Sequence, residues 1–349
     1  MSGDETARSI RSRLLSAGIK KIMPSVICDN VVKTFGRGGK VRALDGLTFE
    51  VGEGEVFGLL GPNGSGKTTF VKCCLNIIFP TSGRIQVLGK KPGHPSIARQ
   101  TGYLPENPNF YDHLSGREFL HYHAELAEVL LKERKSRVED SLQYVKLDMS
   151  AAGRRLRTYS KGMLQRIGIA QALINRPTLV FLDEPQTGLD PIGRRQIKDI
   201  MKEIAGNGSA VFFSSHVLSD VEDVADRVAI IDHGRLRKIA TVDELTRTGN
   251  KVTIRLGSNL NASDGIAPNE AISKIAQQIG AEELSLKQNT LICSVQSEDL
   301  IPELISSLCG QGFRIFEVKH ERLSLEDSFL KEFGALVEKN EKNDKPLDS

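Results

Sequence analysis

Nine consecutive residues combine glycines, a lysine and hydroxyl side chains: Gly61, Pro62, Asn63, Gly64, Ser65, Gly66, Lys67, Thr68 and Thr69. Glycines let a backbone turn tightly, so that several N–H groups can point into one hollow. The apolar run 56–60 before this stretch predicts a buried strand, and the pattern of 71–78 after it predicts a helix. Because a helix N-terminus adds partial positive charge at the same place, the stretch predicts a phosphate-binding site.

The spacing of Gly61, Gly66, Lys67 and Thr68 fits the P-loop pattern. In that pattern the lysine reaches the outer phosphates of a nucleotide, and the hydroxyl group after it binds Mg²⁺. A glycine-rich turn before a helix also occurs in proteins that bind no ligand. Here every fixed position is present between a predicted strand and a predicted helix, so we expect nucleotide binding.

Two adjacent carboxylates follow a second apolar run, over 178–182. Ligand crevices of α/β sheets lie at the carboxyl ends of parallel strands. We therefore expect Asp183 to bind Mg²⁺, directly or through water, and Glu184 to orient or deprotonate an attacking water. The alternative is that both acids only begin a helix. A third apolar strand, 210–215, leads to His216, which can donate and accept hydrogen bonds and so could sense a terminal phosphate.

An aromatic residue, Phe35, ends a predicted strand over 26–35, just before a turn of glycines and lysine. A ring at that position can stack on a nucleotide base, although strand aromatics are more commonly part of a core.

Composition narrows the classes of function. The chain has 349 residues, enough for two domains, and 39% hydrophobic with 26% charged residues is typical of a globular protein. The net charge is only +3 and no dense basic stripe is present, so we expect no nucleic-acid partner. The five cysteines show no zinc or redox spacing, which favours reduced, structural thiols in the cytosol. No apolar run approaches the roughly 18 residues of a membrane span, so membrane work would need a partner chain.

The pattern along the chain predicts four regions. Residues 1–24 are expected to be a flexible extension, with a membrane-surface helix as the alternative. Residues 25–248 contain the motifs above, and 107–177 within them have helical patterns. Residues 249–337 follow the order βαββαβ, which predicts a small α+β ferredoxin-like domain. The polar tail, 338–349, is expected to be disordered.

Together these residues resemble the ATP-binding-cassette (ABC) family over about residues 25–248. The resemblance implies an α/β P-loop NTPase fold with a parallel core sheet, an antiparallel β subdomain and a helical insert. It also implies ATP and Mg²⁺ as cofactors and a role for each matching residue. These residues are Phe35 at the base, 61–69 at the phosphates, Ser160, Lys161, Gly162 and Met163 as the signature, Asp183 and Glu184 as Walker B, Asp190 in the D-loop, and His216 as the switch histidine.

Two motifs depart from the family pattern. The signature is usually Leu-Ser-Gly-Gly-Gln, whereas Lys161 replaces a glycine here and Met163 replaces the glutamine. Ser160 and Gly162 remain, and they are expected to meet the terminal phosphate; we expect Lys161 to point to solvent. Glu106 stands where the family usually has glutamine. Its carboxylate can still offer an oxygen to Mg²⁺ but adds negative charge near the triphosphate.

The resemblance further implies partners. Two cassettes, most simply a homodimer, would dock head to tail, with ATP held by Lys67 of one copy and by Ser160 and Gly162 of the other. Closure would drive a separate membrane permease, for export, with the chain at the cytoplasmic face. Phe110 and Tyr111 lie where relatives meet the membrane subunit, or else they are core residues.

Two rival functions use the same loop. One is a soluble cassette ATPase that remodels a cytosolic complex such as the ribosome, but such relatives usually carry two cassettes and this chain has one P-loop. The other is a P-loop kinase, which has no use for a signature at Ser160 and Gly162 or for a glutamate beside the Walker B aspartate.

Overall fold

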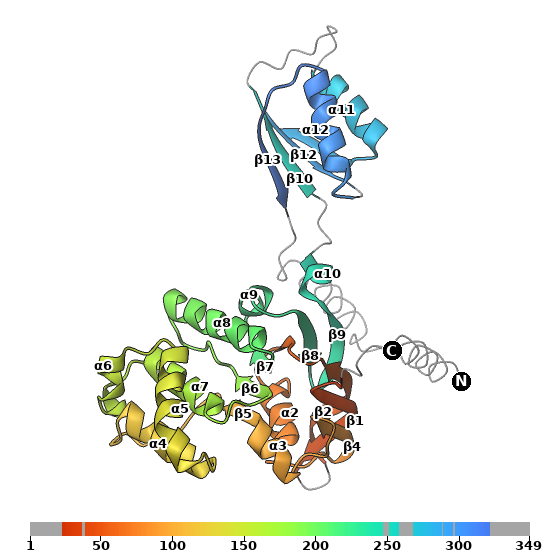
Figure 1. Ribbon diagram of the computed structural model, residues 1–349. Helices are drawn as coiled ribbons and strands as arrows, with labels where there is room; N and C mark the ends of the chain where they lie inside the picture. Colours follow the sequence, from red (N-terminus) through yellow and green to blue (C-terminus); the bar gives the residue numbers. More distant parts are fainter. Residues whose placement is uncertain are drawn as a thin grey trace, which may run out of the picture. The chain divides into compact units, whose positions relative to one another are not determined.

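The chain forms two compact units, one up to Thr241 and one from Val242 (Figure 1). The computed structural model describes residues 23–36, 39–246, 251–257, 268–287, 289–295 and 297–321. Two sequence predictions fall wholly or almost wholly outside these ranges, the extension over 1–24 and the tail over 338–349, and the end of the region 249–337 lies outside them as well.

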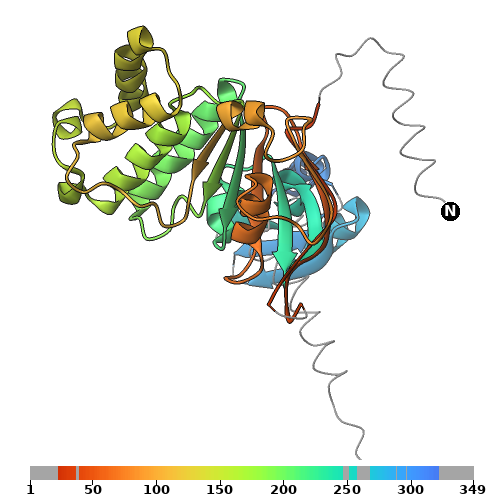
Figure 2. The ribbon, with the colours of Figure 1, turned by 90° about the horizontal axis from the view of Figure 1, so that it is seen from below.

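A six-stranded sheet in the order β5-β6-β7-β3-β8-β9 forms the centre of the first unit. Its strands are β3 (Val56–Leu60), β5 (Thr101–Leu104), β6 (Leu179–Asp183), β7 (Ala210–Ser215), β8 (Arg227–Asp232) and β9 (Arg235–Thr241). All neighbours pair in parallel except β9, which is antiparallel to β8. Every residue of β3, β6 and β7 is buried, as expected for central parallel strands covered on both faces. Figure 2 shows helices against this sheet.

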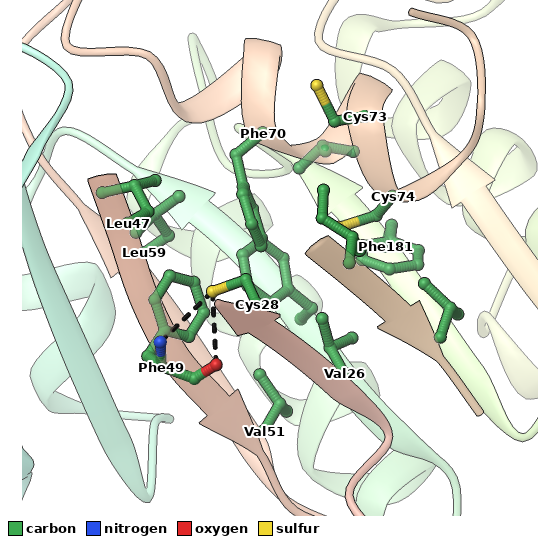
Figure 3. Close-up of a cluster of buried hydrophobic side chains, with 14 of the residues drawn as sticks. Val26, Cys28, Leu47, Phe49, Val51, Leu59, Phe70, Cys73, Cys74 and Phe181 are labelled. Atoms are coloured by element: carbon green, nitrogen blue, oxygen red, sulfur yellow. Dashed lines mark hydrogen bonds between the residues drawn. The ribbon is translucent and has the colours of Figure 1, made fainter. Parts of the chain in front are cut away.

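A three-stranded antiparallel sheet, β2-β1-β4, packs beside the central sheet. It consists of β1 (Val26–Phe35), β2 (Val41–Val51) and β4 (Ser82–Val87). Aromatic rings join the two sheets and the helix α2 (Lys67–Cys74), because Phe49 packs 5.4 Å from Phe57 and 5.1 Å from Phe70, measured between ring centroids (Figure 3). This core fixes the helix that begins at the P-loop lysine.

The cysteines of this core are buried thiols. The Sγ atom of Cys28 lies 3.2 Å from both the backbone N and O of Phe49 (Figure 3). Burial raises the pKa of Cys28 to about 12 and that of Cys73 to about 11. Because the thiolate is the reactive form, both groups are structural thiols.

A helical insert follows β5. It contains α4 (Gly116–Leu126), α5 (Leu131–Tyr144), α6 (Met149–Ala152), the 3-10 turn Leu156–Thr158 and α7 (Lys161–Leu173). Ser115 and Glu118 form a capping box at the start of α4. The short helix α3 (Pro95–Gln100) precedes β5, whereas α8 (Pro191–Gly206) and α9 (Leu218–Glu222) flank β7. Two sheets and this insert are the architecture that the family resemblance implied for the first unit.

The second unit begins with α10 (Val242–Thr246) and contains a four-stranded antiparallel sheet in the order β11-β12-β10-β13. Its other elements are β10 (Lys251–Leu256), α11 (Pro268–Ile279), β11 (Glu282–Lys287), β12 (Thr290–Ser294), α12 (Leu300–Gly310) and β13 (Ile315–Glu321). Both long helices contribute to one buried core with the sheet. The predicted order of strands and helices is therefore present.

The expected helix bounds after the P-loop were wrong. A helix was expected over 71–78, but α2 begins at Lys67 and ends at Cys74. Gly66, with φ 107°, starts the helix inside the loop, and Asn76, with φ 60°, ends it, because a left-handed residue cannot continue an α-helix.

Candidate functional site

The glycines of the P-loop are required for two different reasons. A Cβ atom at Gly61 would overlap the backbone oxygen of Ile231, and one at Gly66 would overlap the backbone oxygen of Ala43. Gly64 has open space around it, but its φ of +81° is one that other residues rarely adopt. Backbone crowding and local conformation therefore both select glycine in this loop.

Neighbouring strands hold the loop in place. The Gly61 N–H donates to the backbone oxygen of Ser215 at 3.1 Å, and the Gly234 N–H, from the β8–β9 turn, donates to that of Ser65 at 3.0 Å. The loop is thus tied to the ends of two strands that lie on either side of β3.

Lys67 is a buried cation at the bottom of the loop. Its Nζ atom donates to the backbone oxygens of Gly61 at 2.7 Å and Pro62 at 3.1 Å. The same atom lies 3.2 Å from Oε1 of Glu184, and the two side chains are only 6% and 7% exposed. The P-loop lysine and the second Walker B acid therefore form a direct ion pair.

Glu184 is held from several sides. Its Oε2 atom accepts from the Thr187 hydroxyl at 3.1 Å and lies 2.8 Å from Nδ1 of His216. Its backbone N–H donates to the Ser214 hydroxyl oxygen at 2.9 Å. The residue has φ 51°, a conformation that costs on the order of 1–3 kcal/mol and that persists only where its surroundings enforce it. These contacts aim the carboxylate at Lys67.

Asp183 has one satisfied and one free oxygen. Oδ1 accepts from the Ser214 hydroxyl at 2.6 Å, whereas the buried Oδ2 has no hydrogen-bond partner among the described residues. Burial, with Asp183 and Glu106 nearby, raises the pKa of Tyr103 to about 12, because a phenolate there would face two carboxylates. A free, buried carboxylate oxygen in a negative environment is suited to a cation.

One pocket brings most of the predicted nucleotide residues together. It is lined by Ala43, Asn63, Gly64, Gly66, Lys67, Thr68, Thr69, Glu106 and Glu184. Phe35 does not line this pocket; it ends β1 as an exposed ring, with Nζ of Lys33 4.9 Å from its centroid.

The signature residues do not line the P-loop pocket of their own chain. The hydroxyl oxygen of Ser160 accepts from the backbone N–H of Met163 at 3.3 Å and so caps α7. Asp190 caps α8 in the same way, by accepting from Gly193 at 2.7 Å. The residue before the signature, Tyr159, is buried and donates to the backbone oxygen of Ala151 at 2.8 Å.

Lys161 is exposed, in agreement with the expectation that it points to solvent. The end of its side chain lies near Gly188, where a Cβ atom would overlap the ammonium group. Gly188, with φ +72°, lies two residues before Asp190.

Sequence reasoning missed the residues that support the acids. Ser214 contacts both Asp183 and the backbone of Glu184, and Thr187 contacts the Glu184 carboxylate. The polar pair 214–215 at the end of an apolar strand was a usable signal for the first residue. No spacing rule pointed to Thr187, because its contact depends on the turn after Glu184.

Comparison with known proteins identifies relatives over most of the chain. A family model described as ABC transporter matches residues 44–187. An uncharacterized ABC transporter ATP-binding protein of Nostoc sp. (strain PCC 7120) is 39% identical over 89% of this chain and 90% of that protein. The bacitracin transport ATP-binding protein BcrA of Bacillus licheniformis is 31% identical over 85% of this chain and 94% of that protein. A daunorubicin resistance ATP-binding protein, DrrA3 of Streptomyces coeruleorubidus, is 35% identical over 66% of this chain and 75% of that protein.

Solved structures match the first unit in size and fold. A structure described as the ATP binding subunit of an ABC transporter is 28% identical with a TM-score of 0.57, over 64% of this chain and 92% of that chain. A dimeric ATP-binding cassette bound to ADP and Pi has a TM-score of 0.58 at 24% identity, over 62% of this chain and 98% of its own, and shows likeness of fold. With these relatives and this pocket, the chain belongs to the ABC transporter family, as an ATP-binding subunit that hydrolyses ATP.

Proposed function

We propose that two copies of this chain close around ATP and Mg²⁺, that Glu184 is the general base, and that closure drives export through a separate membrane permease. The catalytic part of this proposal rests on a connected series of three side chains. Nζ of Lys67 lies 3.2 Å from Oε1 of Glu184, and Oε2 of Glu184 lies 2.8 Å from Nδ1 of His216. A lysine for phosphate, a base for water and a histidine beside that base are what ATP hydrolysis requires.

The two carboxylate oxygens of Glu184 have separate tasks in this mechanism. Oε2 is held by Thr187 and by His216, whose Nδ1 must donate because an ionised carboxylate only accepts. That assignment leaves Nε2 of His216, when it also carries a proton, to donate to the terminal phosphate. Oε1 faces Lys67, and once phosphate oxygens replace it there, Oε1 can take a proton from the attacking water.

The residues for Mg²⁺ fit the ion. Asp183 offers a buried oxygen without a hydrogen-bond partner among the described residues, and Thr68 and Glu106 line the pocket with oxygen atoms. Oxygen ligands are what Mg²⁺ prefers, and it usually keeps several waters. When bound, the ion would neutralise charge on the phosphates.

That Ser160 and Gly162 lie outside the pocket of their own chain supports a role for a second copy. In a head-to-tail homodimer they would meet the ATP of the partner. A solved cassette of similar fold is described as dimeric, which supports pairing of two cassettes. Phe35 would stack on the base, since its ring is exposed at the end of its strand.

The aromatic residues after Glu106 divide between core and surface. The ring of Phe110 packs 5.4 Å from that of Phe119, whereas Tyr111 is 48% exposed and lies edge-on to the exposed Tyr122 at 5.5 Å. We assign the permease contact to this tyrosine pair.

Export is supported by the relatives named for bacitracin transport and daunorubicin resistance. No helix among the described residues has the length and apolar character to cross a membrane. We place the chain at the cytoplasmic face through this permease partner.

For the regions, we propose an ATPase domain over 25–248 and an accessory domain over 249–337. The division of contacts near Thr241 supports a boundary in this region. The strand order β11-β12-β10-β13, with α11 and α12 as crossovers, supports a ferredoxin-like topology for the second domain. We assign this domain to packing between subunits.

The catalytic proposal is tested by phosphate release from Glu184→Gln. We expect turnover to fall by roughly 10²–10⁴-fold while ATP still binds, because the amide cannot accept a proton. Wild-type turnover in this variant would remove Glu184 from the role of base.

For the permease contact, a photo-crosslinker at Tyr111 should capture a co-purified membrane protein, and one at the exposed Leu131 is the control. Equal capture from both positions, or capture only from Leu131, would contradict the assignment.

A further inference from the structure

A buried carboxylate, Asp220, lies four residues after His216 on the short helix α9. Its side chain is 5% exposed and outside the pocket of the P-loop. With the amide of Gln186 oriented so that its nitrogen faces the acid, that nitrogen lies 2.7 Å and 2.8 Å from the two oxygens of Asp220. Gln186 is two residues after Glu184, so the acid binds the segment that carries the base.

Two cations of α8 face the same carboxylate. Nζ of Lys198 lies 3.3 Å from Oδ1 of Asp220, and a guanidinium nitrogen of Arg194 lies 3.6 Å from Oδ2. Arg194 also donates to the backbone oxygen of Leu189, next to the D-loop aspartate, at 3.3 Å. Asp220 thus joins three segments: the one after Glu184, the start of α8, and the one after His216.

The contact between His216 and Glu184 depends on how these segments are placed. His216 lies between the end of β7 and the start of α9, and its ring reaches Glu184 from there. Two side-chain contacts therefore join the same pair of segments: that of His216 with Glu184, and that of Asp220 with Gln186. Both line one small pocket beside the base.

We infer that Asp220 is a positioning residue, which holds His216 against Glu184 and so sets the rate of ATP hydrolysis rather than ATP affinity. This inference rests on the roles proposed above for Glu184 and His216. The amide of Gln186 and the cations of Arg194 and Lys198 all donate to Asp220. An asparagine at this position would turn its own NH₂ group, also a donor, toward at least one of them, and that contact would be lost. The local fold of Asp220→Asn should survive, because Lys198 retains its ion pair with Asp223, 2.6 Å away.

The test compares Asp220→Asn with Asp223→Asn. Asp223 binds the same lysine, but its side chain is 62% exposed, and it therefore makes a matched control. We expect kcat of Asp220→Asn to fall by roughly 10- to 100-fold, since small misplacements of reacting groups have effects of up to about 10²-fold. We expect its KM for ATP, and both constants of Asp223→Asn, to change by less than about 3-fold.

A second comparison separates positioning from a general structural effect. In a His216→Ala background, Asp220→Asn should lower single-turnover hydrolysis by no more than about 3-fold further, because residues that act through one contact are not additive. In Asp220→Asn, the NMR signal of the His216 ring should also shift, and in Asp223→Asn it should stay as in the wild type.

The outcomes are distinct. An equal loss from Asp220→Asn with and without His216, or wild-type turnover in the single variant, would overturn the inference and leave the proposed function intact. Wild-type turnover in His216→Ala alone would instead refute the role proposed for His216, and the inference about Asp220 with it.

Discussion

Glu184→Gln should do more than remove the base: it should also tighten ATP binding to the isolated chain. Lys67 is paired with Glu184 at 3.2 Å, and both side chains are almost fully buried. ATP can use the lysine only by displacing this carboxylate. A neutral glutamine competes less well for the lysine and does not repel the phosphates, so both effects favour ATP.

The size of the effect follows from the geometry. At an effective dielectric constant of about 20, unit charges 3.2 Å apart attract each other by roughly 5 kcal/mol. Desolvation of two buried charges offsets most of this attraction. Oε1 of Glu184 has no hydrogen-bond partner among the described residues, so what remains is the attraction of the ion pair alone, and a neutral amide keeps only part of it. We therefore expect a gain of about 1.4 kcal/mol, which is about tenfold in Kd.

The assay is ATP binding by calorimetry in EDTA, at chain concentrations where the protein is monomeric. Glu106→Gln is the comparison, because it removes one negative charge from the same pocket but leaves the ion pair of Lys67 with Glu184, and so measures the loss of phosphate repulsion alone. We expect its Kd to change by less than about 3-fold. Thermal unfolding gives a second readout: nucleotide-free Glu184→Gln should have a lower Tm, because Lys67 is left buried with a weaker partner. Unchanged ATP affinity in Glu184→Gln, or the same gain in Glu106→Gln, would refute the competition.

Three further predictions concern other parts of the site and core. His216→Ala should lower kcat by roughly 10²-fold with ATP binding retained, measured by phosphate release; an unchanged rate would contradict its contact with the base. Gly61→Ala should abolish ATP binding, because a Cβ atom there would overlap the backbone of Ile231. Gly64→Ala has space for its Cβ atom and should lose only about 1 kcal/mol of stability through its positive φ. If calorimetry and thermal unfolding gave the same ATP affinity and the same stability for both variants, this distinction would be contradicted. At pH 8 a thiol reagent should label Cys309, which is exposed, and spare Cys28, whose pKa is raised to about 12; mass spectrometry that finds Cys28 modified in the folded chain would contradict its burial.

The sequence predicted the parts of the site that depend on local chemistry. Glycine spacing located the P-loop, and apolar runs that end in Asp183 or His216 located the ends of neighbouring strands. These predictions succeed because period and turn chemistry are written in consecutive residues. The order of elements in the second unit was predictable for the same reason.

Other features depend on contacts between distant segments. The ion pair of Lys67 with Glu184 joins residues more than 100 positions apart, and the contacts of Asp220 depend on packing of α8 against α9. The proximity of Lys161, the first residue of α7, to Gly188 likewise depends on how two separate segments pack. The start of α2 was misplaced because the lysine of the loop is itself helical, and residues there follow phosphate chemistry rather than apolar periodicity.

The central claim is that two copies share each ATP, with the P-loop from one and the signature from the other. It is tested most directly by light scattering on Glu184→Gln with ATP and Mg²⁺. We expect a monomer without nucleotide and a dimer that holds two ATP molecules with it, and Ser160→Arg in the same background should prevent the dimer. A Glu184→Gln chain that stays monomeric while saturated with ATP, or a Ser160→Arg variant of it that still forms the dimer, would contradict the claim.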